Sequence, residues 1–160
     1  MTDHSKRAKV LLKTMKHACM ATVNEDGSPH ATPFMFLYDI DLGHIYWGSH
    51  PESLHSKNIL RTKQAFIVIY DSLNGGGLYM KCVGAHPLEG DELKAAVKVH
   101  NDTRAERGQD ELSWEYYTEQ SPQRMWSASP VEFWVNDAER DTSGHISRDY
   151  RVEIAREDLI

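Results

Sequence analysis

The stretch YWGSHPESLHSKNIL, from Tyr46 to Leu60, places a predicted strand, a turn and a short helix in immediate succession. The start of a helix exposes unpaired N–H groups and a partial positive charge, so it favours an anion. Serine hydroxyls and Lys57 add charge-assisted bonds, and Gly48 permits a close backbone approach. The stretch therefore predicts a phosphate site. The alternative is that Ser53 only caps the helix and that Lys57 is a solvated surface residue.

The composition and charge of the chain limit its class. With 160 residues, 40% hydrophobic and 26% charged, the sequence indicates one globular domain over residues 1–160. The formal net charge of −6 argues against a nucleic-acid-binding protein, because a phosphate backbone needs a basic face. No apolar run approaches the ~18 residues of a membrane-spanning helix, and residues 1–18 do not resemble a signal peptide. We therefore expect a cytoplasmic protein in which Cys19 and Cys82 are buried free thiols rather than a disulfide.

The apolar periodicity predicts a mainly β protein with helices, of the α+β class. Single apolar faces predict helices over residues 4–17, 53–62 and 91–106, with Asp3 and Asp91 as N-caps of the first and last. Alternating or β-branched runs between turn signals predict six or seven antiparallel strands, over residues 19–23, 30–40, 44–49, 64–71, 77–88, 129–136 and 149–155. The run from Gln64 to Asp71 predicts a strand buried on both faces, and residues 107–126 predict a helical turn and a loop. This pattern favours an antiparallel barrel with helices packed around it.

The order of short motifs along the chain resembles a known family. The motifs are DGSP, TPFMF, YWGS, SKNI and VGAH between Ala18 and His86, followed by VEFWVNDAER near the carboxyl end. Together they resemble the pyridoxamine 5′-phosphate oxidase-related group of FMN-binding split barrels. In this chain, Glu132, Phe133, Trp134 and Arg140 match the spacing of a motif near the carboxyl end of the oxidases. The resemblance implies a split β-barrel homodimer with two FMN molecules in the subunit interface.

The resemblance also implies which residues bind the cofactor. The second strand would lie along the flavin ring, and the strand end and the following helix would hold the phosphate. Carried onto this sequence, the cofactor-binding residues would be Thr32, Pro33, Phe34 and Met35 beside the flavin, Trp47, Gly48 and Ser49 along the ribityl chain and phosphate, Ser56 and Lys57 on the phosphate, and Trp134 from the partner subunit.

Departures from the family pattern bear on the substrate. The oxidases carry an arginine at the position of Thr32 and a lysine near Leu37, and they follow the residue matching Arg140 with a histidine and a second arginine. This chain has DTSG at residues 141–144 instead. A phosphate dianion is not bound without compensating donors, so these losses argue against pyridoxamine 5′-phosphate as substrate. Arg140 and Trp126 remain the predicted substrate-binding residues.

The predicted function is an FMN oxidoreductase that passes hydride or electrons through the flavin to or from a small molecule. The donor would be reduced nicotinamide, NAD(P)H, and the acceptor a quinone, a nitro compound or oxygen. Whether the protein is an enzyme stays open, because a non-catalytic carrier or stress-response sensor that binds flavin, deazaflavin or haem fits the same residues. A purely structural barrel is a third reading.

Other residues leave further alternatives. Nine histidines lack the spacing of a metal motif, so we expect no metal site; His50 and His55 flank the phosphate turn, where either could contact FMN. A crowd of aromatic residues predicts either core and dimer packing or a lid over the flavin. Its members are Trp114, Tyr116, Tyr117 and Trp126.

Overall fold

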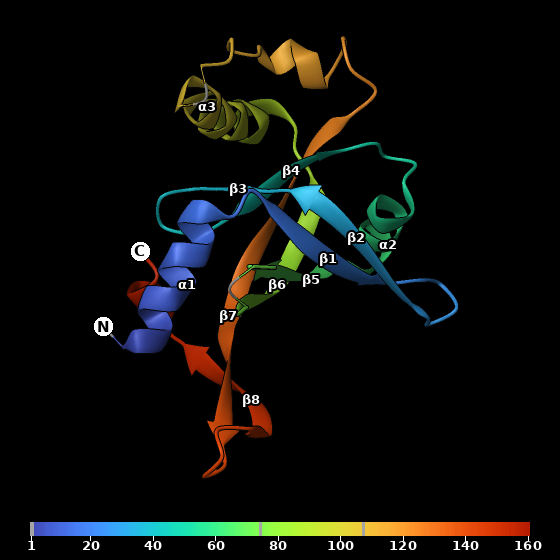
Figure 1. Ribbon diagram of the computed structural model, residues 1–160. Coiled ribbons are helices and arrows are strands. Elements are labelled where there is room, and N and C mark those ends of the chain that lie inside the picture. The colour runs from blue at the N-terminus through green and yellow to red at the C-terminus, as the bar shows by residue number, and fades with distance from the viewer. Residues whose placement is uncertain (1, 74, 107) are drawn as a thin grey trace.

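A computed structural model describes residues 2–73, 75–106 and 108–160. The described residues form a barrel-like sheet with α1 along one side and α3 above it (Figure 1). The elements in chain order are α1 (Asp3–Thr14), β1 (His17–Val23), β2 (Pro29–Met35), β3 (Leu37–Tyr38), β4 (Ile45–Ser49), α2 (Leu54–Thr62), β5 (Gln64–Tyr70), β6 (Gly77–Pro87), α3 (Gly90–Glu106), the 3-10 helix η1 (Trp114–Tyr117), β7 (Arg124–Arg140), β8 (Ile146–Ile154) and the 3-10 helix η2 (Arg156–Asp158).

The sheet is antiparallel throughout its described pairings, as the sequence predicts. Its order is β2-β1-β5-β6-β7-β4-β3, and β8 pairs with the outer part of β7. The two ends of this order are neighbours in the chain, because Phe36 is the one residue between β2 and β3. The sheet therefore curls until its ends meet at Phe36, which gives a split barrel and leaves few exposed edges.

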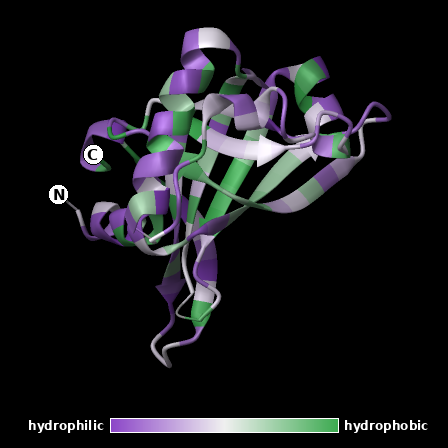
Figure 2. Ribbon diagram, turned by 90° about the horizontal axis from the view of Figure 1, so that it is seen from above, coloured by the Kyte–Doolittle hydropathy of each residue, from purple (hydrophilic) through white to green (hydrophobic). Residues whose placement is uncertain are grey.

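The core fills the barrel and the space under α1. Ile67 and Met80 are opposite each other in β5 and β6 and are both fully buried. Ala8, Leu11 and Leu12 of α1 pack on the same cluster, and Figure 2 shows hydrophobic segments gathered in the central strands. Burying each large aliphatic side chain contributes about 1.5–3 kcal/mol, so this interior holds the strands that carry the site.

Two predicted strands and the predicted number of strands differ from the observed structure. The predicted strand over residues 30–40 is broken at Phe36 into β2 and β3, because the chain passes there from one end of the sheet to the other. The predicted strand over 129–136 extends to residues 124–140, since β7 pairs with β4, β6 and β8 along its length. The break at Phe36 brings the described strands to eight, and the prediction of six or seven was wrong.

Two finer predictions about these elements were also wrong. β5 alternates between buried and half-buried positions rather than being buried on both faces, because Phe66 on its outer face stacks on Trp134 instead of a covering helix. The N-cap of α1 is Thr2, whose hydroxyl accepts the N–H of Ser5 at 3.2 Å. Asp3 is inside the first turn of α1, and Asp91 is inside that of α3, where negative charge still favours the helix.

Both cysteines are free, which confirms that they form no disulfide. Burial raises the pKa of the Cys82 thiol to about 12, whereas Cys19 is only half-buried. Within the described residues, no helix has the length and apolar composition that crossing a membrane requires.

Candidate functional site

A cavity of about 340 Å³ lies between β2, β4, the start of α2 and the segment that connects α3 to β7. This volume is within the usual range for small-molecule sites. A larger groove of about 840 Å³ lies between α1, β3 and α3, but its lining residues include none of the predicted cofactor residues. The smaller cavity is lined by Pro33, Phe34, Met35, Leu37, Trp47, Gly48, Ser49, His50, His55, His100, Tyr117, Gln123 and Met125.

One wall of the cavity is apolar. Phe34 of β2 and Trp47 of β4 contact each other edge to face, with ring centroids 5.9 Å apart. The indole Nε1 of Trp47 is buried and has no hydrogen-bond partner among the described residues. An unpaired buried N–H group costs free energy, so a bound molecule that offers an acceptor to Nε1 would gain from it.

The opposite corner holds a hydroxyl–imidazole cluster, which we define as Ser49, Ser53, His55 and Ser56. The Oγ of Ser49 is 2.6 Å from His55 Nε2 and 3.1 Å from Ser53 Oγ. Ser56 is fully buried, and its hydroxyl donates to Ser49 at 3.2 Å. Ser56 therefore orients Ser49 from below, while Ser49 and His55 face the cavity.

The cluster coincides with the amino end of α2, as the sequence predicts. Ser53 is the N-cap residue, but its side chain makes no capping bond to the helix. Its hydroxyl instead contacts the hydroxyl of Ser56 and the carbonyl of His50. The first-turn amides and the helix dipole thus add positive potential at this corner.

Lys57 is one turn into α2 and forms an ion pair with Glu52. Their Nζ and Oε2 atoms are 2.9 Å apart, and the two side chains are 54% and 72% exposed. The pKa of Glu52 lies below its usual value because Lys57 donates a hydrogen bond to it and attracts its charge. An exposed pair of this kind is weak, so a dianion at the corner can compete with Glu52 for Lys57.

The imidazole of His55 is half-buried, and this sets its protonation. Burial lowers the pKa of His55 from its usual value, and the nearby charge of His30 on β2 lowers it further. The neutral form is therefore favoured until an anion binds next to it.

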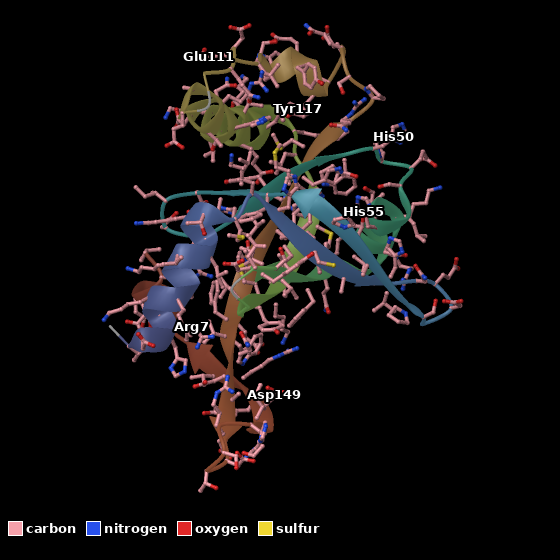
Figure 3. All side chains as sticks on the ribbon, viewed as in Figure 1. Arg7, His50, His55, Glu111, Tyr117 and Asp149 are labelled. Carbon is pink, nitrogen blue, oxygen red and sulfur yellow. The ribbon has the colours of Figure 1, made fainter. Side chains whose placement is uncertain are left out.

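The wall facing β4 comes from α3, η1 and the start of β7. A Cβ atom at Gly48 would be 3.2 Å from Gln123 Oε1 and 3.7 Å from Tyr117 Cε1. The side chains of Gln123 and Tyr117 therefore pack directly against the backbone of Gly48. The Tyr117 hydroxyl is 2.9 Å from His100 Nδ1, and burial raises the pKa of Tyr117 to about 12. In Figure 3, Tyr117 is on the side of α3 and η1, and His55 is near α2.

The cavity brings together most, but not all, of the predicted cofactor residues. Six of them line it: Pro33, Phe34, Met35, Trp47, Gly48 and Ser49. Thr32 is half-buried beside them, with its hydroxyl near the Pro33 carbonyl. Ser56 and Lys57 are behind and outside the cavity wall, as described above.

The remaining predicted site residues, Trp126, Trp134 and Arg140, do not line the cavity. Trp126 is buried under β4, where its Nε1 donates to the Ser49 carbonyl at 3.1 Å. Trp134 stacks on Phe66 on the outer face of the sheet, with ring centroids 6.1 Å apart. Arg140 donates to the Gly144 carbonyl at the tip of the β7–β8 hairpin, which projects away from α3 and η1 in Figure 1.

Sequence reasoning missed part of the α3-side wall. No site role was predicted for Leu37, His100 or Gln123. A histidine among Leu and Ala positions on the buried face of α3 was the available signal. Within the described part of the chain, no group of three or more His, Cys, Asp or Glu residues is placed to hold a metal ion.

A family profile described as pyridoxamine 5′-phosphate oxidase matches residues 5–143. The chain belongs to this family. Membership of the pyridoxamine 5′-phosphate oxidase family is consistent with the observed split-barrel fold. A search of curated proteins finds no match.

Solved structures of other proteins share the fold. A haem-binding protein from Mycobacterium smegmatis is 20% identical, with a TM-score of 0.67 over 99% of this chain and 60% of that one. HutZ, a haem storage protein from Vibrio cholerae, is 15% identical, with a TM-score of 0.61 over 79% of this chain and 89% of that one. A Clostridium acetobutylicum protein related to general stress protein 26 is 10% identical, with a TM-score of 0.62 over 98% and 96%. At these identities the likeness establishes the fold alone.

Proposed function

We propose that the protein binds FMN in this cavity and acts through it as an oxidoreductase. One observation carries the proposal: a single cavity joins an apolar, partly aromatic wall to the hydroxyl–imidazole cluster at the start of α2. A flavin needs an apolar slot for its ring system and a set of donors for its phosphate. Both parts are present, and the unpaired Nε1 of Trp47 offers an additional donor.

In this proposal each wall has its own task. Pro33, Phe34 and Met35 lie along the ring system, and Ser49 and His55 donate to the phosphate. Lys57 exchanges Glu52 for the phosphate, because a dianion attracts an ammonium group more strongly than an exposed carboxylate does. When bound, FMN supplies the electron chemistry, and the chain supplies position and exclusion of water.

The same proposal includes a homodimer. Outside the cavity, Arg151 lies over the ring of Tyr79 at 4.1 Å and over that of Phe66 at 5.4 Å, and Trp134 stacks on Phe66. In a dimer this aromatic face would bring Trp134 and Arg140 to the cavity of the other subunit. Mass measurement by light scattering tests the dimer, and a monomer at micromolar concentration would contradict it.

The binding test is a titration of the purified protein with FMN, followed by quenching of flavin fluorescence. We expect saturable binding that Ser49→Ala weakens about tenfold, since a donor to a charged group contributes about 1.5–3 kcal/mol. Ser113→Ala is the matched control, because Ser113 is exposed and caps nothing with its side chain. Equal losses in both variants, or no binding by the wild type, would refute the proposed site.

Turnover is tested by adding NADPH or NADH to the FMN-loaded protein. Bleaching of the flavin absorbance faster than that of free FMN supports an oxidoreductase. Bound flavin that resists reduction supports the carrier or sensor alternative.

A specific observation favours haem as the second candidate. Three histidines, His50, His55 and His100, line the same cavity, and two proteins of this fold are described as haem-binding or haem storage proteins. Neutral imidazole is a common haem ligand. Titration with haemin and with FMN in competition separates the two candidates: displacement of FMN by haemin at lower concentration would favour haem.

A further inference from the structure

The two ends of the cavity differ in what they can bind. The hydroxyl–imidazole cluster and the amino end of α2 make one corner suited to an anion. At the other end the lining residues are Tyr117, His100, Gln123 and Met125. Of the described residues that line the cavity, none is a Lys, Arg, Asp or Glu. Only one corner thus favours a phosphate, and the far end favours an uncharged molecule.

The far end nevertheless offers a directed polar group. The hydroxyl of Tyr117 and Nδ1 of His100 are 2.9 Å apart, and both side chains are buried. Nδ1 either accepts the phenol proton or carries a proton that it donates to the phenol oxygen. In the second tautomer the phenol O–H can donate to a bound ligand while its oxygen keeps the bond from His100. Because burial raises the pKa of Tyr117 to about 12, the phenol keeps its proton at neutral pH.

The cavity of about 340 Å³ beside this pair is large enough for a single ring. Gly48 presents bare backbone toward Tyr117 Cε1 and Gln123 Oε1. Leu37, Met125 and Trp47 supply the neighbouring apolar surface. Because Tyr117 and Gln123 already lie within contact distance of Gly48, a flat molecule would lie in the cavity against Tyr117 and this apolar surface, with one acceptor atom directed at the phenol.

We propose that Tyr117 is the hydrogen-bond donor that recognises the substrate, that His100 is its positioning residue, and that the substrate is an uncharged planar carbonyl compound of the quinone class. The proposal rests on the proposed function only in calling this ligand the substrate. The recognition itself needs no flavin, and it can be measured on the protein without FMN.

The test compares two probes of nearly the same shape by equilibrium dialysis. Duroquinone is a neutral quinone whose ring is fully methylated, so it does not readily alkylate thiols, and durene is the hydrocarbon without the carbonyl groups. We expect the wild type to prefer duroquinone to durene. Tyr117→Phe should lower duroquinone affinity about fivefold, the usual effect of losing one neutral hydrogen bond, and leave durene affinity unchanged.

The neighbouring Tyr116→Phe variant is the matched control. Tyr116 packs edge to face on Tyr117, with ring centroids 5.0 Å apart, but does not line the cavity. Its loss of a hydroxyl should change neither affinity. If Tyr117→Phe weakens both probes equally, Tyr117 acts through packing and the proposal fails. It also fails if the variant weakens neither probe, or if the wild type does not prefer duroquinone.

His100 is tested by conservative rescue. His100→Leu should reduce the preference for duroquinone over durene as far as Tyr117→Phe does, and His100→Gln, which can still bond the phenol, should restore much of it. Similar losses in both His100 variants would refute the positioning role. FMN titration of the same proteins separates this inference from the proposed function. If the anion corner is wrong, the wild type will not bind FMN, whatever its preference for duroquinone. If only the Tyr117 assignment is wrong, FMN will bind all of these proteins equally well.

Discussion

The anion corner and the far end of the cavity are built in opposite ways. At the corner, the donors come from one local segment, residues 49–57, and Lys57 is kept at the surface by Glu52. At the far end, the donor is a buried phenol held by a histidine seventeen positions earlier in the chain. The corner suits an anionic ligand that replaces water and the Glu52 carboxylate as the partner of the donors. The far end suits a neutral ligand that is selected by its shape and by one hydrogen bond. Variants that affect one end alone test this difference.

The largest effect is expected from adding a side chain at Gly48, which precedes Ser49 of the corner and is within contact distance of Tyr117 at the far end. Gly48→Val would place methyl groups against Tyr117 and Gln123, and overpacking of this kind costs about 1–3 kcal/mol. FMN and duroquinone should both bind roughly 30-fold more weakly, which corresponds to the middle of that range. Fluorescence titration and dialysis measure the losses.

Gly48→Ala is the control for this substitution. Its Cβ atom meets only the flexible end of Gln123 closely, at 3.2 Å, so its effect should be much smaller. If Gly48→Val leaves both affinities intact while thermal unfolding shows a folded protein, the cavity is not the binding site.

A smaller effect, confined to the corner, is expected from Lys57→Ala. FMN affinity should fall about fivefold, because solvent screens a side chain that is 54% exposed. Duroquinone affinity should not change. The reciprocal variant Glu52→Gln removes the competing carboxylate and should tighten FMN binding, most clearly at low salt. A loss of duroquinone binding in Lys57→Ala would show that the two ends are not independent.

The smallest effect concerns the pH dependence of folding at the corner. The pKa of His55 is lower in the native protein than its usual 6.5, through burial and then His30. Between those two values the unfolded chain binds more protons than the native chain, so acidification favours unfolding. This part of the stability is complete above pH 6.5 and is lost as the pH falls toward the native pKa of His55.

Urea unfolding of the wild type and of His55→Gln at pH values between 7.5 and 5.5 measures this difference. The wild type should lose more stability over that interval than the variant, because glutamine does not titrate. Parallel curves would show that His55 is not desolvated, which would weaken its role in the cluster.

The strand, turn and helix start at the anion corner could be predicted from the sequence because their signals are local. The end of β4, the turn over residues 50–53, the start of α2 and the hydroxyls of Ser49 and Ser56 are within one short segment, where the signals of a helix start apply directly. The same segment could not indicate that Glu52 pairs with Lys57, since that depends on the turn geometry.

The far end could not be predicted in this way. His100 and Tyr117 meet only because α3 and η1 fold back over β4, and the residues between them carry no regular period. For the same reason the full length of β7 was missed: its first part pairs with β4 and its last part with β8, and neither partner is visible from the local pattern. Long-range pairing, not local preference, decided both outcomes.

The junction at Phe36 carries a consequence for how this protein can change over evolutionary time. Met35 and Leu37 line the cavity, and Phe36 between them belongs to the interior of the barrel. Since neighbouring positions of an extended chain face opposite sides, adding or deleting one residue here would turn a cavity-lining side chain inward and an interior one outward. A substitution at this point changes the cavity lining at one position, whereas an insertion or deletion would exchange the two faces of the strand.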